Sequence, residues 1–192
     1  SCSEGDQGFI YDGFLDFKTN NIDLNSLPSI NTKLMMNVGS PSTAYKSSRI
    51  PNHGVGLARQ EFIINNFIKV HPLALINYDK ITDQKLINNI DNIIRGFKSP
   101  TDFYVDKLTY GISKIASAFY PKDVIVRFSD FKSNEYRNLL GGNLYEPHEE
   151  NPMIGWRGAS RYYSKKFAPA FELESLAINK DRDEHSSLNI IV

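Results

Sequence analysis

Two arginines in this sequence directly follow short apolar runs that resemble buried strands. Arg59 comes after residues 54–58 (GVGLA), and Arg127 comes after residues 123–126 (DVIV). In parallel sheets, ligands bind at the carboxyl ends of the strands, and a guanidinium group offers a rigid fork of donors that fits phosphate or carboxylate. A third arginine, Arg157, lies in a loop that would cover the same face. Together the three arginines predict a site for a small phosphorylated acid.

A purely structural role is the alternative for each arginine. Glu61 and Asp130 lie close to them in the sequence and could form ion pairs with them. Structural ion-pair networks of this kind imitate binding sites. The presence of two arginines at matching strand ends makes the structural role less favoured than it would be for one.

Other residues with catalytic potential give weaker signals. His148, Glu149 and Glu150 are possible metal ligands side by side, but they lack the HExxH spacing that brings two imidazoles together on a helix. A solvated loop is therefore expected there, and no metal site is expected within this chain. The remaining histidines have no evident Ser or Cys partner, so a nucleophilic triad is not supported. These are His53, His71 and His185.

The apolar pattern predicts how the chain would position these side chains. The expected order is strand, helix, strand, helices, strand, long loop, helix and strand, and this alternation indicates βα units with a parallel sheet. Four strands suffice for a small doubly wound sheet or for half of an eight-stranded barrel. The expected strands span residues 33–39, 54–58, 123–130 and 188–192, the helices 40–50, 62–68, 82–96, 99–121 and 164–183, and the loop 132–158.

The first thirty residues differ from the rest of the chain. Residues 8–17 (GFIYDGFLDF) alternate apolar residues with Gly and Asp, which predicts one or two short strands around a turn. Residues 20–31 are polar and contain a proline, as in a linker, so we expect a boundary near Asn31. The chain starts without Met and ends on the apolar run LNIIV, and both ends suggest part of a longer protein.

Composition limits the partners and the compartment. Lys plus Arg and Asp plus Glu are both 22, so the formal net charge is zero and no general basic field attracts nucleic acid or anionic lipid. For the same reason a helix start is favoured over a nucleic-acid surface at residues 161–167 (RYYSKKF). The single cysteine, Cys2, rules out an internal disulfide and favours the cytoplasm. No apolar run approaches the roughly 20 residues of a membrane helix.

Three segments carry a resemblance to a known family. They are residues 54–67 (GVGLARQEFIINNF), 124–142 (VIVRFSDFKSNEYRNLLGG) and 144–162 (LYEPHEENPMIGWRGASRY). These segments resemble the phosphoenolpyruvate (PEP)-utilising enzymes, and in particular the synthase branch of that family. The resemblance implies that residues 1–30 are the tail of a swivelling phosphohistidine domain with its linker. It also implies that residues 31–192 are the first half of a PEP- and pyruvate-binding TIM barrel.

The same resemblance implies a reaction and roles for the three arginines. ATP, pyruvate and water would give PEP, AMP and phosphate, with Mg²⁺. Arg59 and Arg127 match substrate-binding arginines that contact the phosphate and carboxylate of PEP, and Arg157 matches a catalytic arginine that supports the transferring phosphoryl group. Phosphoryl transfer depends mainly on positioning and charge stabilisation, which arginines supply.

Several family features are missing from these residues. They are the phosphorylated histidine, the ATP-binding domain, the Mg²⁺ ligands and the cysteine thought to protonate the enolate. All are expected outside this chain, in the rest of a parent enzyme: the Mg²⁺ ligands and the cysteine beyond Val192, and the others in its remaining domains, so the chain alone should be inactive. Two alternatives are a non-catalytic phosphate-binding or regulatory module, and a scaffold in which two half-barrels pair as a homo-oligomer to bury their sheet edges.

Overall fold

The structure, a computed structural model, describes residues 2–4, 7–21, 23–24 and 27–192. The chain forms two compact units, Ser1–Ile30 and Asn31–Val192. Each unit is described by itself below.

The N-terminal unit contains one small antiparallel hairpin. Strand β1 (Cys2–Glu4) pairs with β2 (Gln7–Phe9), and Cys2 lies opposite Phe9. The strand structure expected for residues 8–17 is confirmed only for Gly8 and Phe9, and residues 10–17 form no strand. Their apolar side chains, Phe14 among them, are exposed, and a strand is not stable without a paired neighbour. The described residues of the expected linker also lie outside β-strands, and residues 22, 25 and 26 fall outside the described part.

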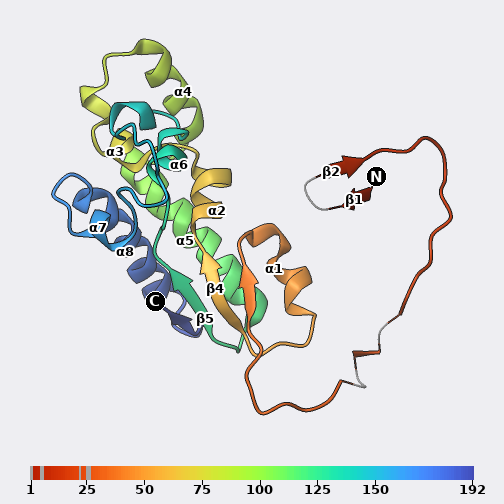
Figure 1. Cartoon of the computed structure of the whole chain (residues 1–192). Coiled ribbons are helices and arrows are strands. Elements are labelled where there is room, and N and C mark those ends of the chain that lie inside the picture. The colour runs from red at the N-terminus through yellow and green to blue at the C-terminus, as the bar shows by residue number, and fades with distance from the viewer. Residues whose placement is uncertain (1, 5–6, 22, 25–26) are drawn as a thin grey trace. The chain divides into compact units, whose positions relative to one another are not determined.

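The second unit is built on a four-stranded parallel sheet. Its strands are β3 (Met36–Val38), β4 (Val55–Arg59), β5 (Val124–Arg127) and β6 (Ile190–Ile191), in the spatial order β3-β4-β5-β6. All four expected strands are present, each near its predicted position, and the predicted parallel sheet is confirmed. This mixed α/β arrangement is compatible with a partial barrel (Figure 1).

Helices follow each of the first three strands. They are α1 (Pro41–Ser48), α2 (Glu61–Ile63), the π-helix η2 (Ile64–Ile68), α3 (Pro72–Ile76), the 3-10 helix η3 (Tyr78–Lys80), α4 (Gln84–Ile94), α5 (Pro100–Phe119), α6 (Ser133–Arg137), the 3-10 helix η4 (Gly142–Leu144), α7 (Ala159–Tyr162) and α8 (Ala168–Glu184).

Side-chain caps define several helix starts. The hydroxyl of Ser40 accepts from the backbone N–H of Ser42 at the start of α1, and Asp83 accepts from two N–H groups at the start of α4. Ser99 caps α5 in the same way, and a proline occupies the first position of both α1 and α5. These local signals place the first turn of each helix without help from the tertiary fold.

Three expectations about the helices were wrong. No helix was expected at α3, although a capping His71 followed by Pro72 starts it. The expected long loop contains α6 and η4, and residues 145–158 are its longest stretch without a helix. The last helix begins at Ala168 rather than at residue 164, because a separate short helix, α7, precedes it.

The core lies between the sheet and its long helices. Helix α5 contacts α1, α3, α8 and β5, and in Figure 1 it passes behind β4. Its buried apolar residues include Phe103, Leu108, Ile112 and Phe119. None of the described helices is both long enough and apolar enough to cross a membrane.

Candidate anion-binding site

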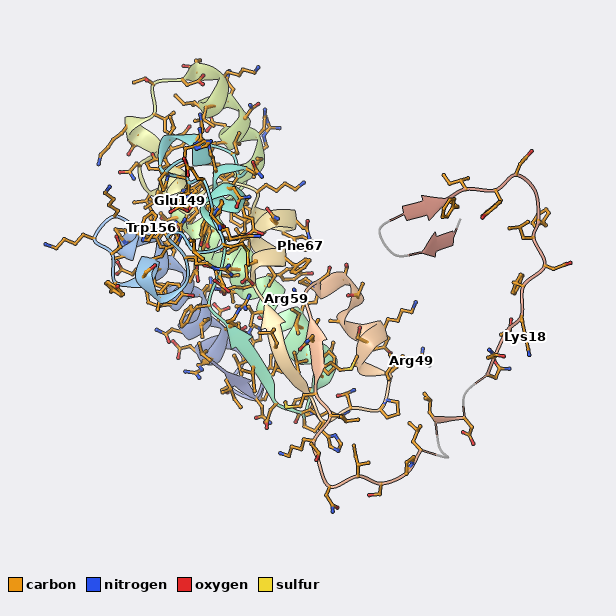
Figure 2. The ribbon with its side chains drawn as sticks, in the orientation of Figure 1. Lys18, Arg49, Arg59, Phe67, Glu149 and Trp156 are labelled. Carbon is orange, nitrogen blue, oxygen red and sulfur yellow. The ribbon has the colours of Figure 1, made fainter. Side chains whose placement is uncertain are left out.

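Arg59 and Arg127 occupy corresponding positions at the carboxyl ends of two neighbouring strands. Arg59 is the last residue of β4, Arg127 is the last residue of β5, and the two are paired in the parallel register. Figure 2 shows Arg59 at the end of the sheet toward the segments that carry Trp156 and Glu149. Like charges on adjacent strands repel each other, so this pairing favours an anion between or beside the two guanidinium groups.

A small hollow opens beside these two arginines. Its volume is about 220 Å³. Acidic, polar and aromatic side chains complete its walls. The lining residues are Arg59, Glu61, Phe62, Asn65, Arg127, Asp130, Phe131 and Glu135. The hollow therefore combines two cations with three carboxylates at the carboxyl ends of the strands.

Arg127 forms the ion pairs that the structural alternative expects. Its Nη2 donates to Glu61 Oε1 at 2.5 Å, and its Nη1 lies 3.5 Å from Asp130 Oδ2. Glu61 Oε1 also accepts from the backbone N–H of Asp130 at 2.8 Å. These bonds tie the start of α2 to the segment after β5. They fix Arg127 in place and partly offset its charge.

Arg157 reaches the same cluster from the loop before α7. Its Nε and Nη2 donate to Asp130 Oδ1 and Oδ2 at 3.0 and 2.9 Å, a two-pronged arrangement. These hydrogen bonds raise the pKa of Arg157. Asp130 thus links Arg127 to Arg157, and the structure brings together the three arginines that the sequence singled out, with Arg59 as the register neighbour of Arg127.

Arg59 differs from the other two because no ion pair holds it among the described residues. Its guanidinium carbon lies 5.0 Å from the centre of the Phe62 ring. Its Nε is buried and has no hydrogen-bond partner. The same is true of Arg127 Nε and Glu61 Oε2. Buried polar atoms without partners are costly and uncommon. An anion with several oxygens would give the two Nε–H donors the acceptors that they lack.

A buried ion pair that the sequence did not reveal holds the Arg157 loop. Arg161 donates from Nη1 to Glu146 Oε1 at 2.8 Å and from Nη2 to Glu146 Oε2 at 2.5 Å, and both side chains are almost completely buried. Arg161 Nε also donates to the carbonyl of Trp156 at 2.8 Å. The backbone immediately before Arg157 is therefore fixed by a side chain four residues after it.

His71 completes this pair from the start of α3. Its Nδ1 accepts from the N–H of Leu73, so its Nε2 carries the proton that it donates to Glu146 Oε1 at 3.0 Å. Burial lowers the pKa of His71. Burial alone would raise the pKa of Glu146, but the hydrogen bonds from His71 and Arg161 outweigh it and lower that pKa.

Aromatic rings enclose the Arg161 guanidinium. Its central carbon lies 4.2 Å from the Trp156 ring centre, 4.6 Å from that of Tyr136 and 5.1 Å from that of Phe167. Such contacts stabilise a desolvated cation. The helix start expected at residues 161–167 is wrong in detail, because Arg161 lies inside α7 as a core residue.

Glu149 is not the solvated loop residue that the sequence suggested. Its carboxylate accepts one hydrogen bond from the backbone N–H of Trp156 at 2.8 Å and another from Ser133 Oγ at 2.5 Å. A Cβ at Gly155 would lie 2.2 Å from Glu149 Oε2, so a larger residue there would require the carboxylate to move from its hydrogen bonds. His148 and Glu150 are exposed, as expected.

His185 has the hydroxyl and carboxylate neighbours that the sequence did not reveal. Its Nδ1 lies 2.9 Å from Asp181 Oδ1 and 3.4 Å from Ser113 Oγ. However, Ser113 donates to Asp181 Oδ1 at 2.7 Å and is largely buried. Ser113 Oγ also lies 2.8 Å from the carbonyl of Thr109, and both of these oxygens are nearer to the hydroxyl than the imidazole nitrogen is. The imidazole is therefore not placed to take the hydroxyl proton, as a nucleophilic serine would require.

The described residues include no group of three His, Cys, Asp or Glu side chains that could hold a metal ion. Near the arginines, Glu61 Oε1 and both Asp130 oxygens accept bonds from guanidinium groups. The donor set present in this part of the chain therefore does not fit a Mg²⁺ site.

Sequence comparisons relate the chain to enzymes that use PEP. A family model described as "PEP-utilising enzyme, PEP-binding domain" matches residues 17–192. The chain is 51% identical over 190 residues to phosphoenolpyruvate synthase of Neisseria meningitidis, and 50% identical over 190 residues to that of Escherichia coli, covering 99% of this chain in each case. It is 43% identical over 234 residues to phosphoenolpyruvate synthase of Aquifex aeolicus. The chain spans only 24% to 27% of the length of these relatives. The chain therefore belongs to the PEP-utilising enzyme family and matches the PEP-binding domain of that family.

Proposed function

We propose that this chain supplies one wall of the PEP site of an enzyme that converts pyruvate, ATP and water to PEP, AMP and phosphate. The register pairing of Arg59 with Arg127 at two strand ends is the observation that carries this proposal. The relatives named phosphoenolpyruvate synthase give the reaction. We further propose that the remaining domains of this enzyme lie outside the chain and that it acts in the cytoplasm.

Each arginine has its own proposed task. Arg59 and Arg127 bind the phosphate and carboxylate of PEP, because both line the hollow at neighbouring strand ends. Arg157 is the catalytic arginine, which stabilises negative charge on the phosphoryl group as it moves. Asp130 holds Arg157 by both oxygens, so the guanidinium is oriented before substrate arrives. Orientation in advance lowers the cost of reaching the transition state.

The architecture that we propose is half of a β/α barrel. The four parallel strands in sequential order would form its first half, and the rest of the sheet would pair with β6. Residues 1–30 would be the end of a swivelling domain with its linker. Mg²⁺ would neutralise phosphate charge, and its ligands would come from outside this chain, since the described carboxylates do not form a site for it.

Replacement of Arg127 in the complete enzyme tests the proposal. Arg127→Ala should lower the rate of PEP formation by about 100-fold or more, because the site loses a positioned charge. Arg49→Ala is the matched control. Arg49 is exposed and lies away from Arg59 in Figure 2, and its replacement should leave the rate unchanged. Circular dichroism of both variants would check that the fold is intact. Turnover by a folded Arg127→Ala enzyme at the wild-type rate would refute the assignment.

A further inference from the structure

Helix α8 carries a carboxylate into the core beneath the strand ends. Glu174 has no exposed surface. Its Oε2 accepts from Gln60 Nε2 at 2.5 Å and from the Ser129 N–H at 3.1 Å. Its Oε1 accepts from Ser129 Oγ at 2.5 Å. Both oxygens are therefore satisfied by residues from the segments after β4 and β5.

The partners of Glu174 are sequence neighbours of the site arginines. Gln60 directly follows Arg59, and Ser129 lies between Arg127 and Asp130. A single carboxylate thus joins the two segments whose arginines border the hollow. The bond lengths of 2.5 to 3.1 Å leave little freedom for one segment to slide past the other.

Two tyrosines extend this connection. Ser129 Oγ lies 2.6 Å from the hydroxyl of Tyr136, and the hydroxyl of Tyr162 donates to the carbonyl of Ser129 at 2.7 Å. Tyr136 belongs to α6 and Tyr162 to α7. The segment after β5 is therefore held from α6, α7 and α8 at once.

A carboxylate at this position is an expensive way to fill the core. No cationic side chain in the described part of the chain bonds to Glu174, and burial, together with the nearby charge of Glu61, opposes its ionisation. Apolar residues of similar volume usually stabilise a core at least as well as buried charged groups do. Stability alone gives no reason for glutamate here, whereas fixing the separation of two strand ends does.

We propose that Glu174 is a positioning residue of the anion site, which sets the separation of Arg59 and Arg127 by holding Gln60 and Ser129. This inference rests on the proposed function, because it assumes that these two arginines bind the substrate. Glu174 itself lies in the core and is not among the residues that line the hollow.

The test compares two replacements of Glu174 in the complete enzyme. Glu174→Leu fills the space and removes all three hydrogen bonds, so the Kd for PEP should rise by at least about tenfold, as for other supporting residues behind a binding site. Glu174→Gln should stay within about threefold of wild type, because its amide oxygen can accept from Gln60 and Ser129 N–H while its amide nitrogen donates to Ser129 Oγ.

A matched control separates positioning from stability. Leu173 is the buried neighbour of Glu174 on α8. Leu173→Ala should lower the Tm, yet it should leave the Kd for PEP unchanged, because it removes no link to the strand ends. If Glu174→Leu does not fold, Ser129→Ala carries the test, since it removes the one described hydrogen bond to Oε1 and should also raise the Kd.

Binding by the Arg127→Ala enzyme distinguishes the two proposals. If Arg127→Ala loses PEP binding but a folded Glu174→Leu enzyme keeps the wild-type Kd, Glu174 has no positioning role and the inference is overturned. The same conclusion follows if Glu174→Gln loses as much affinity as Glu174→Leu. If Arg127→Ala binds PEP as tightly as wild type, the proposed function fails and the inference fails with it.

Discussion

Replacement of Glu146 should lower the free energy of unfolding more than replacement of a surface residue does. Glu146→Ala would leave Arg161 as an unpaired buried cation and His71 Nε2 without an acceptor. Breaking a buried pair by removing one partner typically costs about 3–5 kcal/mol, and we expect a loss in that range in the free energy of unfolding. The three aromatic rings around the guanidinium keep the loss near the lower end, because they still stabilise the cation.

The only tryptophan in the chain provides the assay. The Trp156 ring stacks on Arg161, so its fluorescence should report unfolding of the loop that Arg161 holds. Urea titrations followed by fluorescence and by circular dichroism would give the free energies. Glu150→Ala removes an exposed carboxylate six residues before Trp156 and should change the stability by less than about 0.5 kcal/mol.

A double variant isolates the pairing itself. Arg161→Met combined with Glu146→Leu removes both charges. The double variant should therefore lose less free energy of unfolding than the sum of the losses of the two single variants. A loss of less than about 1 kcal/mol for Glu146→Ala would mean that the pair behaves like a surface ion pair. In that case the claim that it anchors the Arg157 loop would be wrong.

Two further predictions concern Glu174 and Gly155. Burial raises the pKa of Glu174 from 4.5 to about 7, so the folded state binds this proton more tightly than the unfolded chain. The stability that results is fully present at low pH and is lost as the pH rises toward the folded pKa. The free energy of unfolding of wild type minus that of Glu174→Gln should therefore fall by about 3 kcal/mol between pH 4.5 and pH 7. A difference that stays constant over this pH range would contradict the raised pKa of Glu174. Gly155→Ala should cost about 1–3 kcal/mol, because the new methyl group would meet the Glu149 carboxylate. Thermal unfolding measures this cost, and adding Glu149→Ala should recover part of it; equal Tm values for Gly155→Ala and wild type would refute the clash.

Local sequence patterns predicted the elements that local forces determine. The runs before Arg59 and Arg127 are apolar without interruption, which is typical of strands buried on both faces, and β4 and β5 lie there. Ser40 and Ser99 cap their own helices through bonds two or three residues away. Helix α3 could have been predicted from the same kind of signal, because His71 acts as a cap and Pro72 follows it.

The buried ion pair could not be predicted in this way. Arg157 and Arg161 are four residues apart, in one loop and the helix after it, yet the first pairs with Asp130 and is partly exposed, whereas the second is a core residue. What distinguishes them is Glu146, which is 15 residues from Arg161, and His71, which is 75 residues from Glu146. Glu174 meets Gln60 across 114 residues. Contacts of this range exist only after the sheet has brought its strand ends together.

The ion-pair and anion-site interpretations of the arginines are compatible in this structure. Arg127 and Arg157 use Nη or Nε groups on Glu61 and Asp130, which orients both guanidinium groups. The Nε atoms of Arg59 and Arg127 have no described hydrogen-bond partner, and both residues line the hollow. A carboxylate that accepted hydrogen bonds from every N–H group of an arginine would leave none for an anion. A carboxylate that accepts from only some of them orients the guanidinium group and leaves its other N–H groups for the anion. Under the proposed function, these carboxylates would orient the arginines for an anion, so ion pairs and a binding site do not exclude each other.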